Sequence, residues 1–273
     1  REGTNPIFQR LLFSEKERPI VAQIWGKDPK NYYEAAKLIK KLRFDGVDIN
    51  MGCPDKEVVK NGCGIALINN RSLAAEIIAA VKEGAGSASR RMPVSVKTRI
   101  GLDKIITEDW CGFLLEQKFD ALTVHGRTAK EKSDGPAHWD EIAKVVVLRN
   151  QMFGGSNLQS RPPLVIGNGD VKNVQEAGVR SQESGVDGVM IGRGIFENIV
   201  AFSTQPALLS PQENVNLLRE HLRLWEKTWG ETKNFAIMKK FVKAYIKGGE
   251  GAGELRARLF EAKNGREMEE VLR

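Results

Sequence analysis

The chain has 273 residues, 41% of them hydrophobic and 28% charged, which is typical of a globular protein with a sizeable core. It shows no apolar run of roughly 18 residues and no N-terminal secretory signal, and Cys53, Cys63 and Cys111 fit neither a disulfide framework nor a zinc site. We therefore expect a cytoplasmic protein with no membrane span and no metal. The net charge of +7 favours an anionic partner without identifying it.

Short apolar runs alternate with helical patterns from Pro19 to about Phe196, which predicts repeated βα units and a parallel sheet. Strands are expected at 19–26, 46–52, 93–99, 121–127, 163–169 and 188–194. Helices are expected at 29–43, 71–83, 107–117, 138–149 and 172–184. A closed TIM-type (β/α)8 barrel has eight strands, so we expect its first two strands to be missing from this sequence.

After Pro211 the strand pattern stops, and helices are expected at 212–229, 232–247, 252–263 and 266–272. This change predicts two domains, an incomplete α/β barrel over 1–205 and an all-helical domain over 206–273.

The predicted strands all finish in a polar residue or a glycine turn, with Gln23, Asn50, Lys97, His125, Asn168 and Arg193 at these positions. In a parallel barrel the carboxyl ends of the strands converge on one face, where active sites are built. A local turn would explain any one of these residues, but six in series predict a lined pocket.

Two glycine-rich segments, IGNGD (166–170) and IGRG (191–194), follow the last two predicted strands. Each could be an ordinary tight turn. Together they favour a phosphate-bearing cofactor, because barrels frequently hold a phosphate in these loops and Arg193 could clamp it. Lys97 and His125 would place hydrogen-bond donors over the pocket, and such donors suit the pyrimidine edge of a reduced flavin.

The segment DINMGCPDKEVVKNGCG (48–64) places Cys53 in a turn directly after a buried strand. A thiol with the ordinary pKa of about 8.5 keeps its proton at neutral pH and can act as a general acid. An inert buried cysteine is the alternative, and Cys63 is a competing candidate for the acid. Cys111 falls in a predicted helix and is expected in the core.

DINMGCP, SVKTR, TVHGRT, IGNGD and VMIGRG, in this order, closely resemble the signature stretches of the tRNA-dihydrouridine synthases. The resemblance runs from about Pro19 to the C-terminus. It implies an FMN-dependent oxidoreductase that reduces uridine in tRNA to 5,6-dihydrouridine, with NADPH as the electron donor. It also implies a general acid, Cys53, and substrate contacts from Asn50, Arg99 and Arg127. FMN contacts are implied for Gln23, Lys97, His125, Asn168, Gly169, Asp170, Gly192 and Arg193.

Ten basic residues against five glutamates lie between Arg219 and Arg258, interleaved with aromatic residues. Most of these aromatics are expected in a helical core, whereas the basic excess favours tRNA as the partner of a monomeric protein. Two alternatives stay open. One is an FMN-dependent barrel oxidoreductase acting on a free small molecule, and the other is a non-catalytic RNA-binding remnant.

Overall fold

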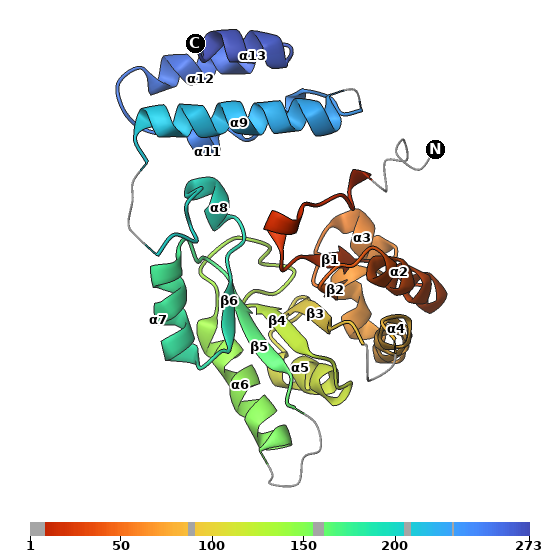
Figure 1. Ribbon diagram of the computed structural model, residues 1–273. Helices are drawn as coiled ribbons and strands as arrows, with labels where there is room; N and C mark the ends of the chain where they lie inside the picture. Colours follow the sequence, from red (N-terminus) through yellow and green to blue (C-terminus); the bar gives the residue numbers. More distant parts are fainter. Residues whose placement is uncertain (1–8, 87–90, 155–160, 205–208, 231) are drawn as a thin grey trace. The chain divides into compact units, whose positions relative to one another are not determined.

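Parallel strands form one sheet in the computed structural model, which describes residues 9–86, 91–154, 161–204, 209–230 and 232–273 (Figure 1). Within these ranges the strands are β1 (Val21–Ile24), β2 (Gly46–Met51), β3 (Val94–Arg99), β4 (Ala121–His125), β5 (Leu164–Asn168) and β6 (Gly188–Met190). Each strand pairs in parallel with the next one along the chain, so that the sheet order is β1-β2-β3-β4-β5-β6. This single direction of winding is that of a (β/α) barrel, because the strand order of a doubly wound sheet reverses. The predicted strands and fold class are confirmed.

The helices that follow the strands are α2 (Pro29–Lys41), α4 (Arg71–Gly84), α5 (Thr107–Glu116), α6 (Trp139–Phe153) and α7 (Val174–Ser184). Local sequence favours the start of α2, where Asp28 accepts a 2.9 Å hydrogen bond from the Lys30 amide and Pro29 occupies the first turn. The described residues of this part of the chain also include three short helical segments. These are η2 (Glu15–Glu17), α3 (Lys56–Lys60) and η3 (Gly64–Asn69).

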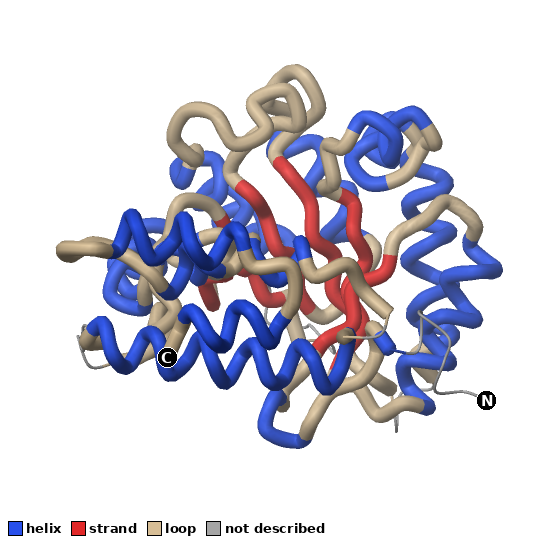
Figure 2. Tube along the Cα trace, turned by 90° about the horizontal axis from the view of Figure 1, so that it is seen from above, coloured by secondary structure: helices blue, strands red, loops and turns tan. Residues whose placement is uncertain are grey.

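The two faces of the sheet differ in character, because successive side chains of a strand point to opposite sides. On the outer face, Ile49 and Met51 of β2 and Val96 of β3 are fully buried in the core with residues of α2, α4, α5 and α6. Figure 2 shows the strands, in red, side by side. The other face, here called the inner face, carries polar side chains of the same strands, so the candidate site lies on it.

By the density of internal contacts the chain divides into two compact units. The sheet unit comprises Phe13–Val171 and Gln175–Gly192, and the helical unit is made mainly of Arg193–Arg273. The domain boundary predicted between residues 205 and 206 falls within 205–208, outside the described residues, and stays a prediction.

The helical unit contains α8 (Gly194–Glu197), α9 (Pro211–Trp229), α10 (Ala236–Lys239), α11 (Val242–Tyr245), α12 (Ala252–Glu261) and α13 (Gly265–Val271). Its core is built from Leu218, Leu222, Trp225, Met238, Val242, Leu259 and Met268, with partly buried aromatics packed against it. One continuous helix over 232–247 was expected, and this was wrong. The amides of Lys240 and Phe241 bond to carbonyls three residues back, and this tighter winding separates α10 from α11.

Among the described residues no single helix has both the length and the apolar character of a membrane span. A bent pair, Lys56–Asn69 with Arg71–Gly84, meets the criteria of length and composition alone, with 93° between its halves.

Candidate active site

Four of the predicted strand-end residues are neighbours on the inner face. The strand register pairs Asn50 with Lys97, and it places His125 between Arg99 of β3 and Asn168 of β5. The convergence expected from a parallel sheet therefore brings these residues together at its carboxyl edge.

A chain of hydrogen bonds leads from a buried carboxylate to the loop of Cys53. Asp48 accepts from the Gln23 amide nitrogen at 2.7 Å and from the Ser95 hydroxyl at 2.6 Å. The Asn50 amide nitrogen donates to the Gln23 side-chain oxygen at 2.9 Å. The Asn50 side-chain oxygen in turn accepts from the backbone amide of Cys53 at 3.0 Å. Because backbone amides can only donate and an ionised carboxylate can only accept, the orientation of both side-chain amides is determined.

Burial and neighbouring charge act on the ionisable groups of this network. Asp48 is 7% exposed, and burial raises the pKa of its carboxyl group even though Ser95, Gln23 and Lys97 favour its charged form. Burial, assisted by the positive charge of Arg99, lowers the pKa of Lys97 to about 8. Lys97 donates no side-chain hydrogen bond to any residue that the structure describes. Its ammonium group is therefore a donor available to a ligand on the inner face.

The three cysteines have different surroundings. Cys53 is half-buried, whereas Cys63 and Cys111 are buried. The Cys63 thiol lies 3.6 Å from the Asn61 carbonyl oxygen, to which it donates, and burial raises the pKa of Cys111 to about 12. Cys111 lies in the core as expected. Of the three thiols, that of Cys53 is the most accessible, which favours it over Cys63 as the reacting group.

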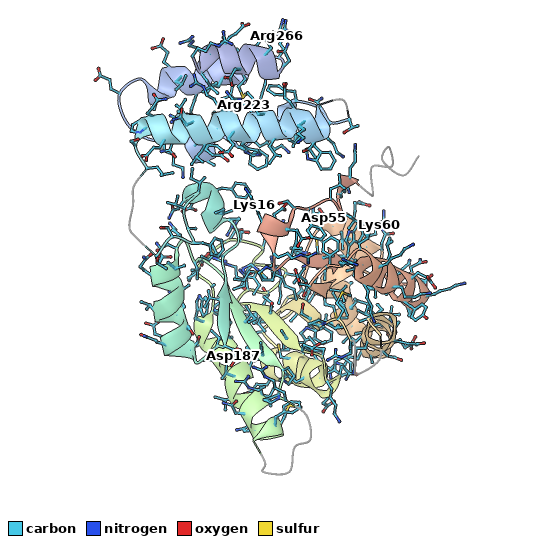
Figure 3. All side chains as sticks on the ribbon, viewed as in Figure 1. Lys16, Asp55, Lys60, Asp187, Arg223 and Arg266 are labelled. Carbon is cyan, nitrogen blue, oxygen red and sulfur yellow. The ribbon has the colours of Figure 1, made fainter. Side chains whose placement is uncertain are left out.

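The loop that carries Cys53 is held by the segments after it. The Ile65 amide donates to the Cys53 carbonyl oxygen at 3.2 Å. Gly64 has a φ of +60°, and a β-carbon there would lie 2.8 Å from the Cys53 carbonyl oxygen, so this close approach requires glycine. Asp55 caps α3 directly after the loop, and Lys60 lies at the end of that helix (Figure 3).

His125 lies beside two residues of the neighbouring loops. Its Nε2 atom is 3.2 Å from the Arg127 guanidinium, which also bonds Asp170 at 2.6 Å. Burial, with the positive charges of Arg99, Lys97 and Arg127, lowers the pKa of His125 to about 3. The imidazole is therefore neutral at physiological pH.

The predicted phosphate turn at 168–170 is tightly packed against the start of α6. Gly169 has a φ of +141°, and its carbonyl oxygen accepts a 3.1 Å hydrogen bond from the Trp139 indole. The buried Asn168 side chain donates to the Met190 carbonyl oxygen at 2.9 Å, which links β5 to β6. Gly192 is exposed at the end of the sheet unit, and Arg193 is exposed at the N-cap of α8 in the helical unit.

Arg99 and Arg127, predicted as substrate contacts, lie inside the protein at 8% and 2% exposure. Arg99 donates to the carbonyl oxygens of Gly52 at 2.9 Å, Thr128 at 3.0 Å and Lys132 at 2.8 Å. In this arrangement both guanidinium groups donate hydrogen bonds to backbone carbonyl oxygens of the loops around the site. Their contact with substrate stays a prediction.

Two network residues were not identified from the sequence as site residues. Asp48 and Ser95 are held together at 2.6 Å, although they belong to different strands. An acidic residue in the middle of the largely apolar strand GVDINM (46–51) is the signal that could have revealed Asp48, because a buried carboxylate needs partners.

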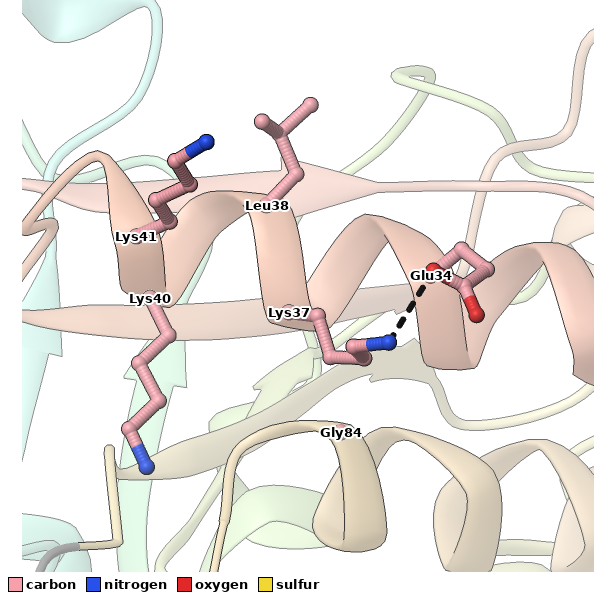
Figure 4. Close-up of a pocket in the computed structure, with 6 residues that line it drawn as sticks. All are labelled: Glu34, Lys37, Leu38, Lys40, Lys41 and Gly84. Carbon is pink, nitrogen blue, oxygen red and sulfur yellow. Dashed lines mark hydrogen bonds and ion pairs between the residues drawn. The ribbon is translucent and has the colours of Figure 1, made fainter.

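A surface groove between α2 and α4 lies apart from these residues. It is lined by Glu34, Lys37, Leu38, Lys40, Lys41 and Gly84, and Lys37 forms a 3.4 Å ion pair with Glu34 (Figure 4). It contains none of the predicted site residues. Among the described residues, no group of three or more His, Cys, Asp or Glu side chains could hold a metal ion.

Comparisons with known proteins agree over almost the whole chain. A family model described as "Dihydrouridine synthase (Dus)" matches residues 4–273. A Staphylococcus epidermidis protein named "Probable tRNA-dihydrouridine synthase" is 39% identical over 273 residues, which cover 99% of this chain and 80% of that protein. A Bacillus subtilis protein named "Probable tRNA-dihydrouridine synthase 2" is 37% identical, with the same coverage. A solved structure of DHODH from Eimeria tenella is 17% identical, and the match covers 72% of this chain and 57% of that chain at a TM-score of 0.45.

Proposed function

Since this chain belongs to the dihydrouridine synthase family, we propose that it reduces uridine to 5,6-dihydrouridine in tRNA. The observation that carries the proposal is the half-buried thiol of Cys53 on a loop held by the inner-face network of Asp48, Gln23 and Asn50. Reduction adds two hydrogens across the C5=C6 bond of uracil, one as hydride and one as a proton. The site therefore needs a hydride source and a proton donor.

The inner face suits FMN as the hydride source. Lys97 and the Nδ1 atom of His125 have no hydrogen-bond partner among the described residues, so both can serve acceptor atoms of a ligand. A flavin ring carries such acceptors along its pyrimidine edge. When bound, FMN would supply the hydride that uracil receives at C6. On the family resemblance we further propose that NADPH supplies the two electrons, so that the overall reaction consumes NADPH and one proton and releases NADP⁺.

Lys97, His125 and Gln23 would hold the flavin ring, and the backbone of Asn168, Gly169 and Asp170 would hold its phosphate, with Gly192 and Arg193. These assignments rest on the resemblance together with the positions of the sheet-unit residues. The phosphate contact of the 168–170 turn is supported by its positive φ angles at Gly169 (+141°) and Asp170 (+55°), because backbone amides in such turns can converge on an anion.

Cys53 would supply the proton. Its S–H bond breaks as a C–H bond forms at C5 of uracil, and the thiolate that remains is reprotonated from solvent. Asn50 has one N–H that is not committed to the network, and this group could hold the uracil while the Asn50 oxygen positions the loop. A uracil that is stacked in RNA cannot lie against a flavin, so the target nucleotide must leave its stack.

The helical unit offers a positive surface for the RNA backbone. Arg223, Lys227, Lys240, Lys243 and Arg258 are exposed on it. Others of the predicted basic residues bond within the unit: Lys239 donates to the Phe260 carbonyl oxygen at 2.7 Å and Arg256 to that of Ile246 at 3.1 Å. Arg223 also forms a 3.5 Å ion pair with Glu269, but its side chain stays 73% exposed. The exposed set is therefore the part of the basic excess that can reach phosphates.

The test is reconstitution with FMN followed by anaerobic addition of NADPH and then of unmodified tRNA. We expect a flavin absorbance that bleaches with NADPH and returns with tRNA, and a nucleoside digest that contains dihydrouridine. Cys53→Ala should bind FMN and tRNA but form little dihydrouridine, whereas Cys63→Ala should remain active. A colourless protein that binds tRNA would instead identify an RNA-binding remnant. Flavin that is reoxidised by free uridine as efficiently as by tRNA would identify a small-molecule oxidoreductase.

A further inference from the structure

The hydrogen bond between Arg127 and His125 determines which imidazole nitrogen carries the proton. Arg127 Nη1 lies 3.2 Å from His125 Nε2. A guanidinium group remains charged in proteins and has only donors, so the imidazole nitrogen that faces it must accept. An accepting Nε2 has no proton, and a neutral ring then carries its proton on Nδ1.

Arg127 is held rigidly in this position. Its side chain is 2% exposed, it donates through Nε to the Gly135 carbonyl oxygen at 3.2 Å, and it pairs with Asp170 at 2.6 Å. The same Asp170 oxygen accepts from the Ala137 amide at 2.8 Å. The guanidinium therefore cannot turn away from the imidazole without breaking its bonds to Gly135 and Asp170.

The ring itself has little room to rotate. A β-carbon at Gly169 would lie 3.5 Å from His125 Cδ2 and 3.8 Å from Nε2, so the Gly169 backbone closes one side of the imidazole. Within the part of the chain that the structure describes, Nδ1 has no hydrogen-bond partner. This nitrogen is thus an unpaired group of a residue that lies between Arg99 and Asn168 in the strand register.

Most of the charged groups around the His125 imidazole lower its pKa, and one raises it. Arg99, Lys97 and Arg127 disfavour a positive ring, and Asp170 favours it. Burial, together with three cations against one anion, lowers the pKa of His125 and keeps the ring neutral.

We propose that Arg127 is a positioning residue that holds His125 as the neutral Nδ1–H tautomer, so that His125 serves only as a hydrogen-bond donor to the ligand on the inner face. This inference rests on the proposed function for the identity of that ligand, a flavin, but the tautomer itself does not depend on it. A neutral imidazole donates hydrogen bonds but is a weak acid, so the proposed role of proton donor stays with Cys53. The ligand atom opposite Nδ1 must be an acceptor.

The tautomer can be read from imidazole ¹⁵N NMR of the ligand-free protein. The chain has three histidines. His138→Gln and His221→Gln together leave His125 as the only imidazole signal, and Gln at position 138 keeps a side-chain donor for the 2.8 Å contact with Glu131. We expect a protonated Nδ1 and an unprotonated Nε2 at every pH between 5 and 8. A ring protonated on Nε2, or one that becomes charged within this range, would overturn the proposal.

The role of Arg127 is tested with Arg127→Met, which keeps most of the side-chain volume and removes the donor. We expect a measurable fraction of the Nε2–H tautomer and an upward shift of the His125 titration midpoint. The control is Lys130→Met, which removes an exposed positive charge from the same loop and should leave both unchanged. An unchanged His125 spectrum in a folded Arg127→Met protein would refute the positioning role. If that variant does not fold, the spectrum of the His138→Gln, His221→Gln protein still decides the tautomer.

FMN titration separates this inference from the proposed function. If FMN binds and shifts the Nδ1–H resonance, the donor role is supported. If FMN binds without shifting it, the donor role is refuted while the flavin proposal stands. If FMN does not bind at all, the proposed function fails, and the tautomer measured in the ligand-free protein is unaffected.

Discussion

The side-chain oxygen of Asn50 accepts a hydrogen bond from the backbone amide of Cys53 at 3.0 Å and from that of Gly52 at 3.1 Å. One side chain at the end of β2 therefore orders the loop that presents the thiol. Asn50 is itself oriented by Gln23, and Gln23 by Asp48. The position of the proposed proton donor thus depends on a buried carboxylate of the same strand, which acts on Asn50 through Gln23 of β1.

Replacing Asn50 with Ala removes the acceptor for both amides. We expect the free energy of unfolding to fall by about 1–2 kcal/mol, because two partly buried N–H groups lose their partner. We also expect faster alkylation of the Cys53 thiol, since the loop becomes less ordered. Urea denaturation and mass spectrometry of iodoacetamide-treated protein measure the two effects. Asn50→Asp keeps the acceptor and is the matched control for the loop; equal alkylation rates in all three proteins would contradict the ordering role.

Lys97 should make stability depend on pH above neutrality. Its pKa is lowered from 10.5 to about 8 in the folded protein, so between these values the unfolded chain binds more protons than the folded one. The free energy of unfolding then rises with pH in this window. The stability gained from deprotonation of Lys97 is present above about pH 10.5 and is lost as the pH falls through about 8. Relative to Lys97→Met, the free energy of unfolding of the unsubstituted protein should gain up to about 3 kcal/mol between pH 8 and 10.5. Parallel curves for the two proteins in urea denaturation would exclude this effect.

Gly169→Ala should disturb the turn proposed to hold the cofactor phosphate. Its φ of +141° is unfavourable for alanine, and the added carbon would lie 2.5 Å from the Ala137 β-carbon. We expect a loss of about 1–3 kcal/mol in stability and weaker FMN binding. Gly178→Ala is the control, because this helical glycine of α7 has open space around it and should gain up to about 1 kcal/mol. Thermal unfolding measures the stability of the two variants and of the unsubstituted protein, and FMN fluorescence titration measures their FMN affinity. Equal FMN affinity in these three proteins would argue against a phosphate site at this turn.

Exposed basic residues of α9 should contribute to RNA affinity. Arg223 lines a groove of the helical unit with Arg266, Glu226 and Glu269 (Figure 3), and Lys227 is exposed one turn further along the helix. Arg223→Gln with Lys227→Gln should weaken tRNA binding and reduce the slope of log affinity against log salt by about 1–2, since up to two phosphate contacts are lost.

The control for the α9 variant is Lys37→Gln with Lys40→Gln in the groove between α2 and α4 (Figure 4). These lysines lie on the outer side of the sheet, in the second half of a helix that returns toward the amino ends of the strands, away from the proposed active face. Their removal should leave the salt slope unchanged. A slope that falls equally in both double variants would indicate a general effect of net charge rather than a contact through α9.

The strands could be predicted from the sequence, whereas the break between two short helices of the helical unit could not. The strand containing Asn50 and the strand containing Lys97 were both recognisable from apolar patterning, and their parallel pairing makes the two residues neighbours. The break between α10 and α11 was not recognisable, because both short helices bury their apolar residues in the same helical core. A buried pattern at helical spacing does not reveal where the winding tightens.

Sequence alone determined the parallel α/β class, the order of the strands and the residues at their carboxyl ends, because these follow from local patterns of apolar and polar residues. It also located Cys53 on a loop directly after a buried strand. Only the tertiary structure decided what the polar side chains do there. Arg127 reaches Asp170, 43 residues away, and Ser95 reaches Asp48, 47 residues away. Such partners are brought together by the packing of neighbouring strands and loops, and no local pattern specifies which donor meets which acceptor.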